Sequence, residues 1–313
     1  DDITDIPGIR VGHDTNLDAG TGCTVVLCDP PAVGGVDVRG GAPATRETDL
    51  LRPLHMVEQV HAILLTGGSA FGLDAASGVM RYLEERNIGV DTAVARVPIV
   101  PAAAIFDLAF GLPNIRPDAA SGYRACEQAS SDAVVQGNVG AGTGATFSKL
   151  LGPLFMLKGG LGSASMTLDD GTLVGAIVVV NALGDVIDPR TQQPSSSNRQ
   201  PELDFGSANP FGNTTIAVVA TSASLTKDGI NKVAQMAHNG IAQAIRPAHT
   251  MFDGDTVFAL ALGTQHSAPD AAAQAFQISQ IGAAAASTLA QAIVKAVHNA
   301  TPLHGVPAAT FSS

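Results

Sequence analysis

The stretch GNTTIAVVAT, residues 212–221, decides the fold, because it joins a long polar loop to a buried strand. The strand part, TTIAVVAT from Thr214, is rich in β-branched residues and lacks regular polar/apolar alternation, which is typical of a strand covered on both faces. The preceding loop, RTQQPSSSNRQPELDFGSANPFG at residues 190–212, is rich in Pro, Ser, Asn and Gln. By composition it is an ordinary connection, but small polar residues at its entry into a buried strand also suit a processing site.

Outward from this junction, further apolar runs predict four more buried strands, at residues 24–28, 62–66, 173–181 and 256–262. Apolar residues at helical spacing predict helices at residues 72–86, 226–245 and 271–298. Thr226 is the expected N-cap of the second helix. Strands and helices mingle along the chain, which predicts a layered α/β or α+β fold.

Composition limits the classes of function. The 313 residues are 45% apolar and 14% charged, and 17 Lys and Arg against 28 Asp and Glu give a net charge of −11. Without a basic run, nucleic acid and acidic membranes are excluded as partners. No apolar run is long enough to span a bilayer, and the start DDITDIPGIRVGH shows no secretory signal. We therefore expect a cytoplasmic protein whose partner is a small molecule or another copy of the chain.

The three cysteines are too few and too irregularly spaced for a disulfide framework or a zinc site. They are interpreted as small buried apolar residues in a reducing compartment. The eight histidines do not cluster either, so neither a metal nor another cofactor is expected.

Common catalytic motifs fit poorly. GGSAF at residues 67–71 ends in Phe instead of the Gly of a nucleophile elbow, so Ser69 is a candidate to line a site, not to attack. The Gly-rich residues 140–144 lack the Lys of a phosphate loop. Asp253 and Asp255 flank a glycine, which fits a structural turn and a functional pair equally well, although further oxygen ligands for Ca²⁺ are missing. Lys149 is either a surface lysine or, if the glycines bring it inward, a functional one.

Five segments, in order along nearly the whole chain, together resemble one family. They are PGIRVGH at 7–13, LTGGSAFGL at 65–73, GNVGAGTG at 137–144, GNTTI at 212–216 with VAT at 219–221, and RPAHTMFDGDT at 246–256. The combination resembles the DmpA-type family of L-aminopeptidase/D-amidase-esterases, which includes β-peptidyl aminopeptidases and nylon-oligomer hydrolases.

The resemblance implies a four-layer α-β-β-α sandwich that assembles as a homotetramer or larger. It also implies that the chain, a single hydrolase domain over residues 1–313, cleaves itself before a Ser or Thr that starts a strand. Here that junction is Asn213–Thr214, which would give chains of residues 1–213 and 214–313.

Site roles follow from the same resemblance. Thr214 would be the nucleophile, Asn181 the oxyanion donor, and Lys149 would face the nucleophile. Asp253 and Asp255 would orient it. Two further residues of the family segments, Ser69 and Asn138, would bind substrate.

Thr214 as a new amino terminus would need no histidine, because its own α-amine, with a pKa of about 7.7–8.0, can act as the base. The expected activity is an aminopeptidase or amidohydrolase that works on small peptides or amides through an acyl-enzyme. The alternatives are an amidase for ω-amino-acid oligomers or pantetheine-type amides, and an inactive ligand-binding protein that keeps the fold.

Overall fold

The computed structural model describes residues 1–150, 152–195, 212–263 and 270–310 of the chain. Within these residues, nine strands form one mixed sheet in the order β10-β11-β13-β15-β2-β4-β7-β3, with β1 paired to β2. These strands are β1 (Ile9–Asn16), β2 (Thr21–Val38), β3 (Thr45–Arg46), β4 (Gln59–Thr66), β7 (Ala102–Ala104), β10 (Gly160–Thr167), β11 (Leu173–Asn181), β13 (Thr214–Thr221) and β15 (Thr256–Ala261).

Helices and short strands complete the described part of the chain. The helices are α1 (Ser69–Gly72), α2 (Ala75–Glu84), α3 (Ala119–Glu127), α4 (Lys227–Ala244) and α5 (Ala271–His298), with 3₁₀ turns η1 (Ile3–Asp5), η2 (Asp49–Leu51), η3 (Gly140–Gly142) and η4 (Pro153–Phe155). The short strand pairs are β5 (Val90–Asp91) with β6 (Arg96–Val97), β8 (Thr146–Phe147) with β9 (Leu157–Lys158), and β12 (Asp185–Val186) with β14 (Ile245–Arg246).

The long strand β2 divides the sheet into two layers. Its first part pairs with β1 and β4, and its last part pairs with β15. The register with β4 shifts between Leu27 and Ala32, across Pro30 and Pro31, which have no N–H to give to a ladder. The sheet therefore bends at this point, and its two halves face each other across a shared core.

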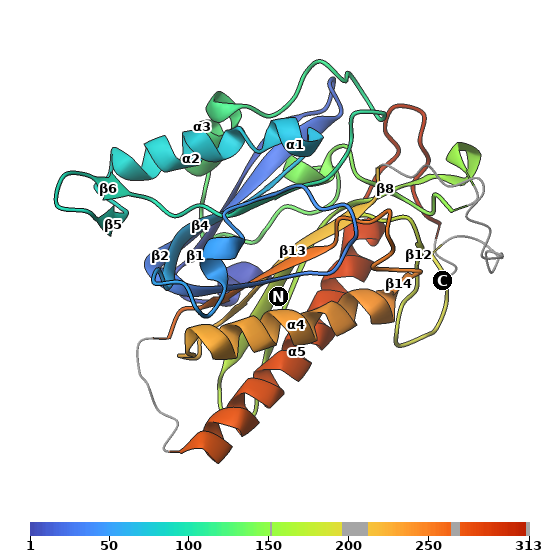
Figure 1. The fold of residues 1–313 in the computed structure, drawn as a ribbon. Coiled ribbons are helices and arrows are strands. Elements are labelled where there is room, and N and C mark those ends of the chain that lie inside the picture. The colour runs from blue at the N-terminus through green and yellow to red at the C-terminus, as the bar shows by residue number, and fades with distance from the viewer. Residues whose placement is uncertain (151, 196–211, 264–269, 311–313) are drawn as a thin grey trace.

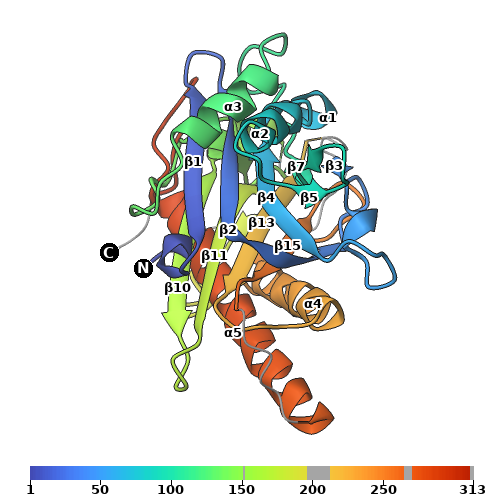
Figure 2. The same cartoon turned by 90° about the vertical axis from the view of Figure 1, so that its left-hand side faces the viewer.

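The halves of the sheet and the helices on either side form four layers (Figures 1 and 2). Three buried hydrophobic cores lie between these layers. The middle core joins the two halves of the sheet, with Ile63 of β4 and Ile216 of β13 among its members. A second core lies between the β1–β2–β4 half and helices α2 and α3, and a third between the β10–β11–β13–β15 half and helices α4 and α5. The predicted four-layer α-β-β-α sandwich is thus confirmed.

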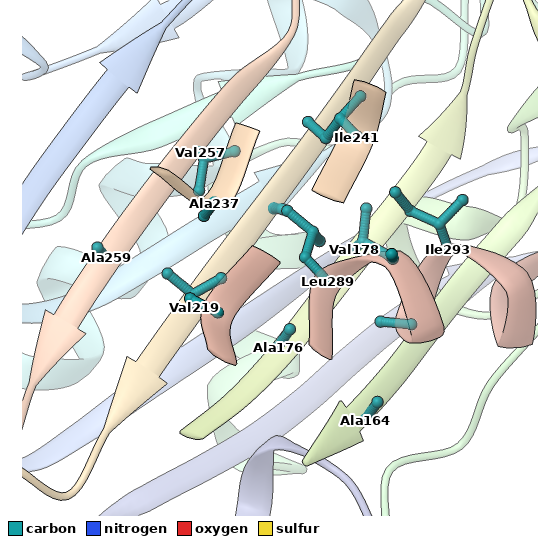
Figure 3. Packing of buried hydrophobic residues seen from close by; sticks show 14 of the residues in the cluster. Ala164, Ala176, Val178, Val219, Ala237, Ile241, Val257, Ala259, Leu289 and Ile293 are labelled. Carbon is teal, nitrogen blue, oxygen red and sulfur yellow. The ribbon is translucent and has the colours of Figure 1, made fainter. Parts of the chain in front are cut away.

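Small residues allow helices α4 and α5 to approach the sheet and each other closely (Figure 3). A Cβ on Gly240 of α4 would lie 2.2 Å from the carbonyl oxygen of Ala286 in α5. A Cβ on Gly162 of β10 would lie 2.1 Å from the carbonyl oxygen of Ala292. The Ala- and Gly-rich composition of these elements is therefore a packing requirement.

The strands predicted at 173–181 and 214–221 and the helix at 271–298 have the predicted bounds. Thr226 caps α4 as predicted, accepting a hydrogen bond from the N–H of Gly229. The single helix predicted at 72–86 is wrong at its start, because α1 ends at Gly72 and α2 begins only at Ala75. Most of the polar loop at 190–212 lies outside the described residues. No helix in the described part of the chain is long and apolar enough to cross a membrane.

Candidate active site

Residue alternation along β13 sets the direction of the two threonines at its start. Ile216 contributes to the core between the sheet halves, whereas Ala217 contributes to the core under α4 and α5. Because side chains alternate along a strand, Thr214 faces the space between the sheet halves and Thr215 faces the helices. Asn181, at the end of β11, is the register partner of Thr214 and lies on the same face by the same alternation.

Two successive carbonyls before Thr214 are held by different donors. The Gly212 oxygen accepts from Lys149 Nζ at 2.6 Å and from Asn181 Nδ2 at 3.0 Å. The Asn213 oxygen accepts the backbone N–H of Gly254 at 2.9 Å and also the hydroxyl of Thr214. The hydroxyl of Thr214 therefore lies against the carbonyl group of the residue before it.

The side-chain amide of Asn181 is buried and has a fixed orientation. Its Oδ1 accepts from the backbone N–H of Thr146 at 3.0 Å and from Lys149 Nζ at 2.8 Å. Its Nδ2 also donates to the carbonyl of Phe106 at 3.2 Å. With the oxygen end occupied by two donors, the NH₂ end must point toward the Gly212 carbonyl.

Lys149 faces inward, and its Nζ donates to the Gly212 carbonyl and to Asn181 Oδ1. Burial lowers the pKa of its ammonium to about 7, although the charges of Asp253 and Asp107 act in the opposite direction. A lysine with this pKa can give or take a proton near neutral pH.

Asp253 and Asp255 are both buried but have different partners. Asp253 Oδ2 accepts from the N–H and the hydroxyl of Thr250 at 2.9 and 2.5 Å. Burial, and then the charge of Asp255, raises the pKa of Asp253 to about 6. Asp255 Oδ1 accepts the N–H of Thr215 at 2.7 Å, so this carboxylate binds the backbone one residue after the nucleophile candidate.

His249 completes the surroundings of Asp255 and was not singled out from the sequence. Its backbone N–H and its Nδ1 contact Asp255 Oδ2 at 2.9 and 2.8 Å. Burial lowers the pKa of His249, but the hydrogen bond and charge of Asp255 outweigh it and the pKa lies above its usual value. The ring packs edge-on against His238 at 4.8 Å. The only signal in the sequence is its place within RPAHTMFDGDT.

Lys158 is a second buried lysine that the sequence did not reveal. Its Nζ donates to the carbonyls of Gly142, Ala145 and Gly159 at 3.0, 2.6 and 2.8 Å. In the β8–β9 pair it is the register partner of Thr146, whose N–H holds the Asn181 amide. Lys158 therefore supports the Gly-rich segment directly behind the site.

The two predicted substrate-binding residues have different positions. Ser69 adopts a φ of 55°, and its N–H donates to the carbonyl of Ile105, one residue before Phe106. The side-chain amide of Asn138 instead donates to the carbonyl of Thr301 at 2.8 Å, near the C-terminal end of the described chain. Ser69 thus bonds to the sequence neighbour of Phe106, whose carbonyl is a partner of Asn181. Among the described residues, the side-chain amide of Asn138 bonds to Thr301 and not to the residues around Thr214.

Across the described residues, no three or more His, Cys, Asp or Glu side chains gather as metal ligands.

Comparison with known proteins gives consistent matches over the whole chain. The model of peptidase family S58 matches residues 1–310. A Mycobacterium tuberculosis protein named as an uncharacterized aminopeptidase is 47% identical over 97% of this chain and 96% of its own length. A 6-aminohexanoate-oligomer endohydrolase of Kocuria sp. is 31% identical over 82% of this chain and 73% of its own.

A solved structure shares the fold at low identity. The L-aminopeptidase D-Ala-esterase/amidase of Ochrobactrum anthropi, described as a variant of the Ntn hydrolase fold, aligns with a TM-score of 0.76 and 20% identity. The alignment covers 98% of this chain and 88% of the other.

Proposed function

This chain belongs to peptidase family S58 and is a hydrolase of peptide or amide bonds, and from that premise we propose that it cleaves itself between Asn213 and Thr214 and then uses Thr214 as an N-terminal nucleophile. The observation that carries the proposal is the hydrogen bond that the hydroxyl of Thr214 donates to the carbonyl oxygen of Asn213. The same carbonyl accepts the Gly254 N–H, so it is both polarised and within reach of the hydroxyl.

Self-cleavage begins with an acyl shift. Thr214 Oγ1 bonds to the Asn213 carbonyl carbon and gives up its proton, the bond from that carbon to the Thr214 nitrogen breaks, and the nitrogen gains a proton. Water then hydrolyses the ester. The products are a carboxylate on Asn213 and a Thr214 with a free hydroxyl and a free α-amine.

The α-amine of Thr214 would form beside Lys149. The N–H of Thr215 points to Asp255, and successive N–H groups of a strand point to opposite edges, so the Thr214 nitrogen points toward β11. On that edge Lys149 Nζ lies 3.2 Å from the backbone oxygen of Asn181. Lys149 can thus supply the proton to the leaving nitrogen. Once water has reprotonated Lys149, its positive charge keeps the new amine neutral enough to act as a base.

In turnover, the departure of residues 212 and 213 removes the carbonyl that Asn181 Nδ2 and Lys149 Nζ hold in the intact chain. These two donors then become available for the oxygen of an incoming amide, which forms an acyl-enzyme on Thr214. Asp255 fixes the strand through the Thr215 N–H, and Asp253 shapes the turn that carries Gly254. Ser69 and Asn138 stay in the proposal as substrate-binding residues.

The proposed substrate is a small peptide or amide with a free amino end, attacked as by an aminopeptidase; the relatives named as aminopeptidases support this choice. A second candidate is the internal amide of an ω-amino-acid oligomer. The 31% identity to a 6-aminohexanoate-oligomer endohydrolase favours it.

The proposal includes chains of residues 1–213 and 214–313 that stay associated as one hydrolase domain, and a homotetramer or larger assembly. It also places the protein in the cytoplasm. All three cysteines are free and buried, which suits a reducing compartment.

Mass spectrometry of the freshly made and the aged protein tests the proposal. We expect the intact mass to give way to two fragments, and Edman sequencing of the smaller one to begin Thr-Thr-Ile-Ala-Val. The aged protein should hydrolyse members of a panel of L-aminoacyl anilides, β-aminoacyl amides and 6-aminohexanoate oligomers. A fragment with another start, or hydrolysis by a chain that never splits, would overturn the assignment of Thr214.

A further inference from the structure

We propose that the backbone N–H of Gly254, and not the side chain of Asn181, stabilises the oxyanion that forms on Asn213 during self-cleavage. This inference rests on the proposed function, since it concerns the cleavage step, but it assigns that step a donor of its own. Asn181 and Lys149 would instead hold the preceding carbonyl and present the junction in register.

The direction of the carbonyls separates the two sets of donors. Successive carbonyl groups in an extended chain point to opposite edges. The Gly212 oxygen points to β11, where it meets Lys149 and Asn181. The Asn213 oxygen points to the other edge, toward β15, where the N–H of Gly254 meets it at 2.9 Å. The negative charge develops on the Asn213 oxygen, so the donor at that edge is the one that can stabilise the oxyanion.

The segment that carries this N–H is held on both sides. Asp253 pairs with Asn213 in a parallel bridge, and its carbonyl accepts the N–H of Ala42 at 2.8 Å. The carbonyl of Asp255 accepts the N–H of Arg39 at 3.0 Å. A donor fixed in this way needs little reorganisation when the charge forms, which is the condition for effective oxyanion stabilisation.

The position also requires glycine. A Cβ on Gly254 would lie 2.8 Å from Thr214 Oγ1 and 3.0 Å from the carbonyl oxygen of Ala42. The missing side chain thus leaves the space in which the Thr214 hydroxyl sits. Gly254 therefore gives this step both a donor and room for the nucleophile.

In the step itself, Thr214 Oγ1 loses its hydroxyl proton to water and bonds to the Asn213 carbon, and the π electron pair of the carbonyl moves onto its oxygen. The Gly254 N–H stabilises that oxygen until the bond to the Thr214 nitrogen breaks. The nitrogen then takes a proton from Lys149, and the carbonyl re-forms as an ester.

An amide-to-ester exchange tests the donor directly. Cell-free synthesis with glycolic acid at position 254 replaces only the N–H of Gly254 by an oxygen. The matched control places glycolic acid at position 41, whose N–H donates to Thr250 at 3.1 Å, away from the scissile carbonyl. Gel analysis over time follows the loss of the intact chain.

We expect the ester at position 254 to slow cleavage by a factor on the order of 10²–10³, the usual effect of losing one oxyanion donor, with the control near the wild-type rate. Cleavage of the 254 ester at the same rate as the control would overturn the inference. The proposed function would still stand in that case, provided that the wild-type chain splits before Thr214.

Asn181→Ala gives a second measurement that does not depend on folding of the ester variant. We expect it to lose substrate turnover and to slow self-cleavage by about tenfold, the effect of losing one bond to the Gly212 carbonyl, which is less than the loss of the oxyanion donor. A loss of self-cleavage on the order of 10²–10³ would place the oxyanion donor on Asn181 and refute the inference.

Discussion

Lys158→Met tests the buried lysine behind the site through the pH dependence of stability. The Lys158 ammonium is buried and bonded to three backbone carbonyls, and burial lowers its pKa from 10.5 to about 7, partly offset by the charge of Asp107. In the unfolded chain the same ammonium keeps its usual pKa. Methionine has a similar length and no charge, so the variant removes this titration.

The sign and size follow from the pKa difference. A group whose pKa is depressed on folding adds stability above its unfolded pKa, and this is lost as the pH falls toward the folded value. For Lys158 the window runs from 10.5 down to about 7. At about 1.4 kcal/mol per pH unit, the free energy of unfolding of the parent should rise by about 2–3 kcal/mol relative to Lys158→Met between pH 7 and pH 9.

Urea unfolding at both pH values measures this in a Thr214→Ala background, which keeps the chain continuous. The exposed Lys232→Met is the matched control and should leave the pH slope as it is. Lys158→Met should also slow turnover, because Lys158 pairs with Thr146, whose N–H orients the Asn181 amide. Parallel pH slopes for the parent and Lys158→Met would refute the lowered pKa of the buried Lys158.

Three further predictions concern single side chains. Lys149→Met removes a positive charge beside the Thr214 amine, so the acid limb of kcat/KM should move to higher pH; an unmoved limb would argue against their proximity. The pKa of Asp253 is raised to about 6 on folding, so its contribution is present below pH 3.8 and is lost as the pH rises through about 6. Between pH 4 and pH 7, the free energy of unfolding of Asp253→Asn in the Thr214→Ala background should therefore rise by up to about 3 kcal/mol relative to its parent, as measured by urea unfolding. A difference in unfolding free energy that does not change with pH would contradict this. Gly240→Ala should cost about 1–3 kcal/mol, because its Cβ would meet the Ala286 carbonyl at 2.2 Å; an unchanged melting temperature would show that α4 and α5 can move apart freely.

The fold was predictable where composition and periodicity agree. Strand β11 (LVGAIVVVN) is a β-branched run between polar residues, and helix α5 is a long Ala-rich run that a cap opens, so both have the predicted bounds. Strand β10 (GLGSASMT) was missed because its small residues carry no strand signal. They are small because α5 lies directly on them, as at Gly162. That reason becomes visible only once the helix is in place.

The candidate site was predictable only in part, because some of its residues are identified only by contacts that the fold creates. The resemblance to the family pointed to Thr214, Asn181 and Lys149, which the structure brings together. Lys158 gave no signal, and His249 gave only its place within RPAHTMFDGDT, because the importance of both lies in contacts with residues that the fold brings close. Lys158, for instance, looks like any surface lysine until three carbonyls are found around its Nζ.

The two adjacent threonines offer the most direct test of the nucleophile. Thr214 Oγ1 contacts the Asn213 carbonyl, whereas Thr215 faces the helices and its Oγ1 has no hydrogen-bond partner among the described residues. Fragment formation and amide hydrolysis should be measured side by side for Thr214→Ala, Thr214→Ser and Thr215→Ala. We predict that Thr214→Ala loses both, that Thr214→Ser keeps some of each, and that Thr215→Ala keeps both. A Thr214→Ala variant that still splits and turns over substrate, with Thr215→Ala doing neither, would contradict the assignment of Thr214.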